Sequence, residues 1–402
     1  MKAMFLTGAT GFVGGQAMMR YVDAAPDLHF YLMVRARDEE HLAKRAAKLM
    51  DVTFGERAEE LASRITFVRG DLLKEGLDLS DEDLATIVAN CDHVVHCAAS
   101  VDFAMPIEES RKFNLDGTRR VIEVCEKIQK TDHGLRRLDY VSTAYVSGNR
   151  EDVVDPSGLS NHGLGWANDY EQSKFEAESL VRGWRSQGNP VCIYRPSTVV
   201  GDSRTGETTN FNVLYWPLRV YARGWWNLMI GFEDTPVDVV PVNYVADCLV
   251  AFSLDDALIG RDYHLAAGPD KICQIRDLAT AASSYFNQDY PRFVTPEKFW
   301  KVYQPAIDKT ATPAQKTLIK QGTVYMPYFV RSPLFDTTTT VEDAEKHGVA
   351  PVVAVTDYFD LLFNYCISTD FGRKKPVKSA GGEGAHSDEL EEKADQLAAP
   401  TV

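Results

Sequence analysis

The sequence predicts an α/β protein built on a doubly wound parallel sheet, with a smaller, mostly helical second region. Short apolar runs rich in β-branched residues alternate with longer helical patterns through the first half of the chain. A glycine-rich turn follows the first of these runs and opens a helix. Hydrophobic residues make up 45% of the chain and charged residues 25%, which is the mix of a folded globular protein.

The first two hundred residues carry the sheet. Six strands are expected, near residues 3–6, 28–34, 65–68, 93–97, 138–142 and 191–194. Helical patterns separate them and start near Phe12, Asp38, Ser80, Pro106 and Asn168. The helix near Ser80 also has a capping signature, because Asp83 follows three residues later and precedes an apolar run.

After residue 196 the regular alternation ends. An aromatic segment at 210–232 contains Tyr215, Trp216, Tyr221, Trp225 and Trp226. A helix at 242–252, a short strand at 263–265 and a helix at 275–286 are expected to follow it. We therefore divide the chain into a sheet domain at 1–200, to which later segments return, a second region at 201–370 and a tail at 371–402. The tail is rich in Gly, Lys, Glu, Ala and Ser and is expected to be disordered, although its acidic cluster at 388–392 could instead form a partner-binding helix.

Charge and cysteine content limit the partners and the compartment. The formal net charge is −15, from 43 Lys and Arg against 58 Asp and Glu, which argues against nucleic acid as a partner. The seven cysteines are odd in number and form no C-x-x-C pair, as in reduced cytoplasmic proteins. A strand begins almost at the first residue and no run of about 18 apolar residues follows, so we expect a cytoplasmic protein without a membrane span. His133, His162 and His264 have no metal-ligand spacing, and no metal is predicted.

The glycine-rich turn reads Thr7-Gly8-Ala9-Thr10-Gly11-Phe12-Val13-Gly14. Its place between a strand and a helix predicts a phosphate-binding turn of the Rossmann type rather than a flexible loop without a ligand. Gly8 permits the tight turn, Gly11 lets the backbone approach a pyrophosphate, and Gly14 lets the helix pack closely on the strand. The start of the helix offers unpaired N–H groups to the phosphates. Predicted cofactor contacts are Thr7, Gly8, Thr10, Gly11, Phe12, Val13 and Gly14.

The end of the second strand favours NADPH over NADH. An NAD-preferring site usually places an acidic residue there, whereas this chain has Arg35 and Arg37. Their planar guanidinium groups suit the oxygens of a 2′-phosphate. Two alternatives stay open, since arginines at a strand end are often only solvated and Asp38 could still serve NAD.

The next two strand ends should also line the dinucleotide. Asp71 follows the third strand, where it could hydrogen-bond the adenine with Leu72 beside it, and Ala98, Ala99 and Ser100 follow the fourth. An Asp in this position is also a common turn former. Ligands of open α/β sheets bind at the carboxyl ends of the strands, and this shared location favours binding.

A phenol and an ammonium group form the candidate catalytic pair. Tyr170 and Lys174 are four residues apart and therefore lie on one face of the helix. A free phenol has a pKa of about 10, and a neighbouring Lys⁺ together with the positive nicotinamide ring should lower that value toward the working range. Ser142 and Thr143, at the end of the fifth strand, supply a hydroxyl that could hold a reacting carbonyl.

These motifs, with a later Tyr-Arg-Pro-Ser-Thr-Val-Val-Gly-Asp at 194–202, resemble those of the extended short-chain dehydrogenases/reductases. The resemblance spans roughly residues 1–290. It implies a Rossmann NAD(P)-binding domain followed by a substrate-binding region, and it places the catalytic hydroxyl on Thr143 with Ser142 as its neighbour. It also implies that Arg195, Pro196, Ser197 and Val199 lie beside the nicotinamide, and that Lys174 holds the nicotinamide ribose.

Within that superfamily the strand-two, helix and strand-six motifs look most like fatty acyl-CoA reductases and the thioester-reductase domains of carboxylic acid reductases. This resemblance implies reduction of an acyl thioester by NADPH to an aldehyde, and in some members onward to an alcohol. The substrate would be carried by CoA or by a carrier protein. The aromatic segment at 210–232 would suit an acyl-binding wall, but core packing, a peripheral membrane contact and a subunit interface stay open for it.

Two rival functions remain at this point. The same Thr, Tyr and Lys also serve extended short-chain dehydrogenases that act on a nucleotide sugar, a ketone or a hydroxysteroid. A redox-sensing binding protein without turnover is the rival of a different class, and the presence of both Tyr170 and Lys174 disfavours it.

Overall fold

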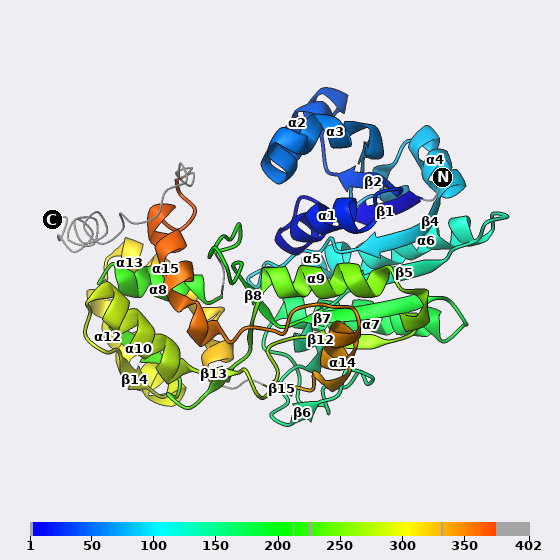
Figure 1. Ribbon diagram of the computed structural model, residues 1–402. Coiled ribbons are helices and arrows are strands. Elements are labelled where there is room, and N and C mark those ends of the chain that lie inside the picture. Colours follow the sequence, from blue (N-terminus) through cyan, green and yellow to red (C-terminus); the bar gives the residue numbers. More distant parts are fainter. Residues whose placement is uncertain (1–2, 212, 225–226, 331–332, 375–402) are drawn as a thin grey trace. The chain divides into compact units, whose positions relative to one another are not determined.

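The computed structural model describes residues 3–211, 213–224, 227–330 and 333–374 (Figure 1). It divides into two compact units. Unit 1 comprises Met1–Val199, Val242–Pro269 and Pro333–Val352, and unit 2 comprises Val200–Pro241, Asp270–Ser332 and Val353–Val402. Trp225, Trp226 and the part of the tail from residue 375 onward, including the acidic cluster, lie outside the described residues.

A seven-stranded parallel sheet forms the centre of unit 1. In spatial order its strands are β12 (Asp262–Leu265), β7 (Val191–Pro196), β5 (Arg137–Val141), β4 (Cys91–His96), β1 (Ala3–Thr7), β2 (His29–Val34) and β3 (Ile65–Arg69). The chain runs outward from β1 to β3 and then returns to the other side through β4, which confirms the doubly wound sheet. The expected strand at 263–265 is β12, and it forms one edge of this sheet.

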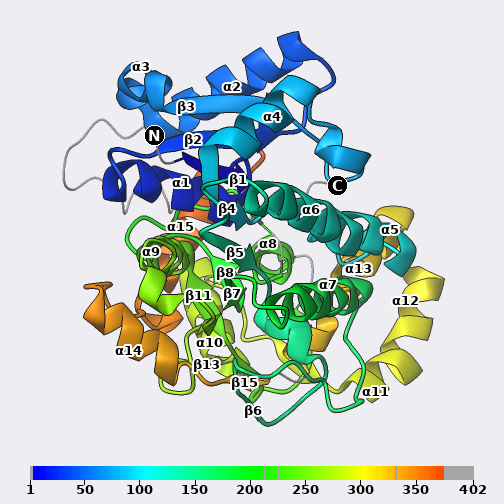
Figure 2. The ribbon, with the colours of Figure 1, turned by 90° about the vertical axis from the view of Figure 1, so that its right-hand side faces the viewer.

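Helices cover both faces of the sheet (Figure 2). One face carries α1 (Phe12–Ala24) and α9 (Val242–Ser253), and the other carries α4 (Asp81–Asn90), α6 (Gly117–Gln129) and α7 (Asp169–Arg185). Apolar side chains of α6 and α7, among them Val121, Ile128 and Val181, pack on Val94 and Leu138 of the strands. Burial of this apolar surface drives the helices onto the sheet.

The helix starts agree with the capping signals in the sequence. Ser80 Oγ accepts a hydrogen bond from the Asp83 amide at 3.0 Å, so the predicted cap of α4 is confirmed. Asn168 caps α7 in the same way by accepting from the Glu171 amide at 3.0 Å. Asp38 caps α2 (Glu39–Phe54) by accepting from His41 N at 2.8 Å. Each cap fixes where its helix begins.

Shorter elements complete unit 1. They are α3 (Ala58–Leu61), α5 (Ile107–Arg111), the π-helical turn Lys112–Asp116, α14 (Thr338–Lys346), β8 (Thr198–Val200) and the parallel pair β6 (Val153–Val154) and β15 (Leu334–Phe335).

Unit 2 is mostly helical. Its helices are α8 (Tyr215–Ala222), α10 (Ile275–Phe286), α11 (Pro296–Lys298), α12 (Gln304–Thr310), α13 (Pro313–Thr323) and α15 (Phe359–Ser368). Its strands are β9 (Leu228–Ile230), which pairs in parallel with β14 (Arg292–Val294), β10 (Pro236–Val237), which pairs antiparallel with β13 (Cys273–Gln274), and β11 (Val239–Pro241). Tyr215, Leu218, Ile275, Phe359 and Phe363 belong to its buried core. Across the described residues, no helix combines the length and the apolar character that crossing a membrane requires.

Candidate active site

The glycine-rich turn depends on the absence of side chains at two positions. Gly8 has a φ of +91°, and a Cβ there would lie 2.6 Å from the Ala98 amide nitrogen. A Cβ on Gly14 would lie 2.2 Å from the Gly8 carbonyl oxygen. Gly8 and Gly14 therefore let β1, α1 and the end of β4 approach closely, as a dinucleotide-binding turn requires.

The first turn of α1 is exposed for an anion. Gly11 is the N-cap residue and, having no side chain, accepts no hydrogen bond from the N–H groups that follow it. Thr10 and Gly11 are exposed, and Phe12 and Val13 are half-buried. Thr7 turns inward, where its hydroxyl lies 2.7 Å from His96 Nδ1. This turn fits the phosphates of a dinucleotide.

Arg35 and Arg37 are exposed beyond the end of β2, and within the described parts of the chain neither guanidinium pairs with a carboxylate. Asp38, the alternative acidic ligand, is the cap of α2. The two cationic groups remain available to a ligand.

The predicted cofactor contacts after β3 and β4 differ in their exposure and in their hydrogen bonds. Asp71 Oδ1 accepts from the Leu73 amide at 3.0 Å, so this carboxylate forms a turn, and Leu72 is buried. Ala99 is exposed, while Ala98 and Ser100 are half-buried.

Thr143 and Tyr170 come together at the end of β5. Both side chains are buried, with exposed fractions of 5% and 8%. Burial raises the pKa of the Tyr170 phenol, while the hydrogen bond with the Thr143 side chain lowers it. The phenol therefore stays protonated at neutral pH and can act as a proton donor.

Lys174 lies one turn further along α7 and is almost fully buried. Its Nζ donates to Tyr140 Oη at 2.9 Å and to the Val141 carbonyl at 3.0 Å. Burial lowers the pKa of Lys174 to about 8, against the opposing effect of Glu178. We expected this ammonium to lower the pKa of Tyr170, but burial dominates and raises it.

Ser142 and Arg195 belong to a buried ion pair instead. Ser142 Oγ donates to Glu178 Oε2 at 2.7 Å, and Arg195 Nε donates to the same oxygen at 3.0 Å. The Arg195 guanidinium also donates to the carbonyls of Pro156 and Gly158, at 3.0 and 2.7 Å. Although burial alone would raise the pKa of Glu178, Arg195 holds it at about 2. These side chains thus anchor α7 to the strands.

The remaining predicted residues follow Arg195 along the chain. The Pro196 carbonyl accepts from Thr143 Oγ1 at 3.3 Å, and the Ser197 amide donates to Leu265 O at 3.1 Å. Val199 is half-buried. Pro196 thus contacts the Thr143 hydroxyl through its backbone.

Asn114 is a site residue that the sequence reasoning missed. It lies in the π-helical turn, is 1% exposed, and its amide donates to Ser173 Oγ at 2.9 Å. Its side-chain oxygen accepts from the Ser100 amide at 2.9 Å. Ser173 in turn donates to the Tyr170 carbonyl at 2.8 Å. Asn114 therefore links the loop after β4 to the helix that carries Tyr170; a polar residue in a helical pattern was the only sequence signal.

Cys97 lies near both the glycine turn and the candidate pair of Tyr170 and Lys174. This half-buried thiol follows β4, accepts a hydrogen bond from the Gly14 backbone, and is close enough to Lys174 and Tyr170 to affect their pKa values. The turn and the phenol thus lie in one region of unit 1. Across the described residues, no group of three or more His, Cys, Asp or Glu side chains could hold a metal ion.

Comparisons with known proteins show the family of the chain. The family described as "Male sterility protein" matches residues 6–249, more than half of the chain. L-2-aminoadipate reductase of Saccharomyces cerevisiae is 31% identical over 63% of this chain and 19% of its own length. A fatty acyl-CoA reductase of Drosophila melanogaster is 27% identical over 64% of this chain and 54% of its own length. The chain thus spans only part of these curated relatives.

Solved structures show the same fold. The terminal R domain of the myxalamid PKS-NRPS pathway aligns with a TM-score of 0.76 at 24% identity, covering 94% of this chain and 92% of that domain. The reductase domain of a nonribosomal peptide synthetase from Mycobacterium tuberculosis aligns with a TM-score of 0.69 at 21% identity, covering 93% and 92%. The chain belongs to the male sterility protein family and shares the doubly wound α/β fold of these reductase domains.

Proposed function

We propose that this protein reduces acyl thioesters to aldehydes with NADPH, and that the acyl group is carried by CoA or by a carrier protein. The observation that carries the proposal is the buried pair of Thr143 and Tyr170 beside the dinucleotide turn. Relatives named as fatty acyl-CoA reductases and as L-2-aminoadipate reductase support this substrate class. Onward reduction of the aldehyde to an alcohol would use the same groups.

The choice of NADPH rests on the end of β2. Arg35 and Arg37 are the charged groups there without a carboxylate partner among the described residues, and their forks suit a 2′-phosphate. Asp38 caps α2, so its carboxylate is already in use. Gly8, Gly11 and Gly14 would hold the pyrophosphate at the start of α1.

The chemistry assigns a role to each side chain. The bound dinucleotide would supply a hydride to the thioester carbon. The Thr143 hydroxyl and the Tyr170 phenol would hydrogen-bond the carbonyl oxygen, and Tyr170 would donate its proton as negative charge develops there. Reformation of the carbonyl then expels the thiolate, which takes up a proton, and an aldehyde remains. Lys174 would hold the ribose, and its hydrogen bonds to Tyr140 and Val141 hold α7 against β5.

The test follows NADPH absorbance with acyl-CoA thioesters of increasing chain length. We expect Tyr170→Phe to lower kcat by about 10²- to 10⁴-fold, the usual contribution of a positioned acid, with NADPH affinity retained. Tyr31→Phe, a half-buried tyrosine on β2, is the matched control and should keep full activity. No NADPH oxidation with acyl-CoA or acyl-carrier substrates would refute the substrate class, and full activity of Tyr170→Phe would refute the site.

We propose the cytoplasm as the compartment, because the seven cysteines are odd in number and form no C-x-x-C pair.

A further inference from the structure

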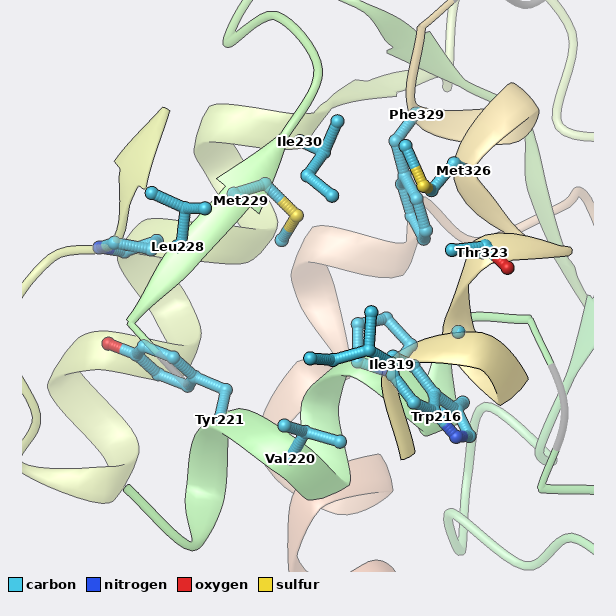
Figure 3. A pocket seen from close by; sticks show the side chains of 13 residues that line it. Trp216, Val220, Tyr221, Leu228, Met229, Ile230, Ile319, Thr323, Met326 and Phe329 are labelled. Atoms are coloured by element: carbon cyan, nitrogen blue, oxygen red, sulfur yellow. The ribbon is translucent and has the colours of Figure 1, made fainter. Parts of the chain in front are cut away.

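Unit 2 contains a pocket that is lined almost entirely by apolar side chains (Figure 3). Trp216 and Val220 of α8 form one wall, and Met229 and Ile230 of β9 form another. Ile319 of α13, with Met326 and Phe329 beyond it, closes a third.

Few polar side-chain atoms line the pocket, and the two hydroxyl groups among them donate their hydrogens to the protein itself. The Tyr221 hydroxyl donates to the Asp289 carbonyl at 2.7 Å, and the Thr323 hydroxyl donates to the Lys320 carbonyl at 2.8 Å. The Trp216 indole N–H has no hydrogen-bond partner among the described residues, and in Figure 3 its nitrogen points away from the space between the side chains. None of the lining residues is charged. A polar group placed inside would lose its hydrogen bonds to water without replacement.

The Trp216 wall is built into the fold. A Cβ on Gly322 would lie 2.1 Å from the Trp216 ring, so the indole can lie against α13 only because residue 322 is glycine. Trp216 also contacts Tyr325, with ring centroids 6.3 Å apart. The two methionines add flexible thioethers that adapt to a ligand's shape.

We propose that this pocket binds the aliphatic chain of the substrate. An aliphatic chain has no hydrogen bonds to lose, whereas a peptide segment would bring unpaired backbone N–H and C=O groups. The identity of the chain as an acyl group rests on the proposed function, but the binding itself does not. The aromatic segment thus divides: Trp216 and Tyr221 line the pocket, while Tyr215 is a core residue whose hydroxyl accepts from the Gly201 amide at 2.8 Å.

Calorimetry with straight-chain primary alcohols tests the proposal without cofactor or turnover. We expect affinity to rise about fourfold for each added methylene until the pocket is filled. An α,ω-diol of the same length should bind more weakly than the alcohol, because its second hydroxyl would be buried unpaired. Affinity that does not depend on chain length would overturn the proposal.

A matched pair of variants locates the site. Ile319→Trp should fill the pocket, so that the rise in affinity stops at a shorter alcohol. Lys320→Trp places the same side chain on an exposed position of the same helix and should leave the series unchanged. An identical series in both variants would overturn the proposal. Normal thioester reduction with no chain-length-dependent binding would refute the pocket alone, whereas chain binding without reduction would refute the proposed function alone.

Discussion

At the scale of single residues, burial determines the chemistry of the site. Lys174 and Tyr170 are both buried. Burial lowers the pKa of Lys174 and raises the pKa of Tyr170, and each shift favours the uncharged form of the side chain. His96 is neutral for the same reason, because burial lowers its pKa to about 3. The site thus presents a protonated phenol in a buried environment, where a hydrogen bond to a developing oxyanion is stronger than in water.

The first prediction concerns the two arginines after β2. The double variant Arg35→Ala/Arg37→Ala should raise the KM for NADPH by about 10- to 100-fold, since hydrogen bonds to a charged phosphate contribute about 1.5–3 kcal/mol. The KM for NADH should stay within about twofold. Lys44→Ala, an exposed cation paired with Glu40 on α2, is the control. Equal shifts for both cofactors would show that the arginines do not select the 2′-phosphate.

The sequence could identify reactive groups but not their partners. Thr143, Tyr170 and Lys174 follow from motif order. Ser142 and Arg195 look equally suitable in sequence, yet both contact Glu178, which is 36 and 17 residues away. Arg137 and Asp139 of β5 are a second example, because they form a buried ion pair. Tyr194 and His93 contact the same carboxylate at 2.8 and 2.6 Å. Only the fold brings such partners together.

At the scale of elements, local rules predicted most boundaries. Strand alternation and caps placed the first six strands and the starts of α1, α2, α4 and α7 close to where they are. They did not predict the π-helical turn, which positions Asn114. Its sequence forms an ordinary helical pattern, so the wider turn comes from tertiary contacts to Ser100 and Ser173.

The second prediction tests the contact between the glycine turn and α1. Gly14→Ala should destabilise the protein by about 1–3 kcal/mol, because its Cβ would overlap the Gly8 carbonyl, and it should abolish dinucleotide binding. Gly183→Ala is the matched control inside α7, where a Cβ meets nothing within 4 Å. That variant should be more stable than the parent by about 0.5–1 kcal/mol. Urea unfolding and NADPH titration measure both effects, and similar behaviour of the two variants would contradict the close-packing argument.

At the scale of the whole molecule, unit 1 is assembled from three stretches of chain. The sheet order could be anticipated from the βαβ alternation, but the return of β12 to the sheet edge depends on pairing with β7 across some seventy residues. In unit 2 the helix expected at 275–286 is present as α10, but the other short elements lack such a pattern and are defined by packing around Tyr215, Ile275 and Phe363. Buried ion pairs then fix how the helices of unit 1 sit on the sheet.

The last prediction concerns the acid stability of unit 1. The pKa of Glu178 is about 2 in the folded protein against an ordinary 4.5, so between these values the unfolded chain binds more protons and stability falls as the pH drops. Above about pH 4.5 the contribution is complete. Glu178→Gln should cost about 3–5 kcal/mol at neutral pH, because Arg195 is left buried without its counter-charge, and should weaken the pH dependence between 4.5 and 2. Glu176→Gln is the control two residues away.

Glu176 and Arg111 form a half-buried ion pair, with side-chain exposures of 24% and 33%, so its loss should cost less than loss of the fully buried Glu178–Arg195 pair. Thermal unfolding of the parent and the two variants from pH 2 to 7 gives the comparison, with the parent's loss of stability in acid as the reference. Equal destabilisation by the two substitutions, or an unchanged acid dependence in Glu178→Gln, would mean that the buried pair does not anchor α7. The position of Tyr170 would then depend on the Asn114 and Ser173 contacts instead.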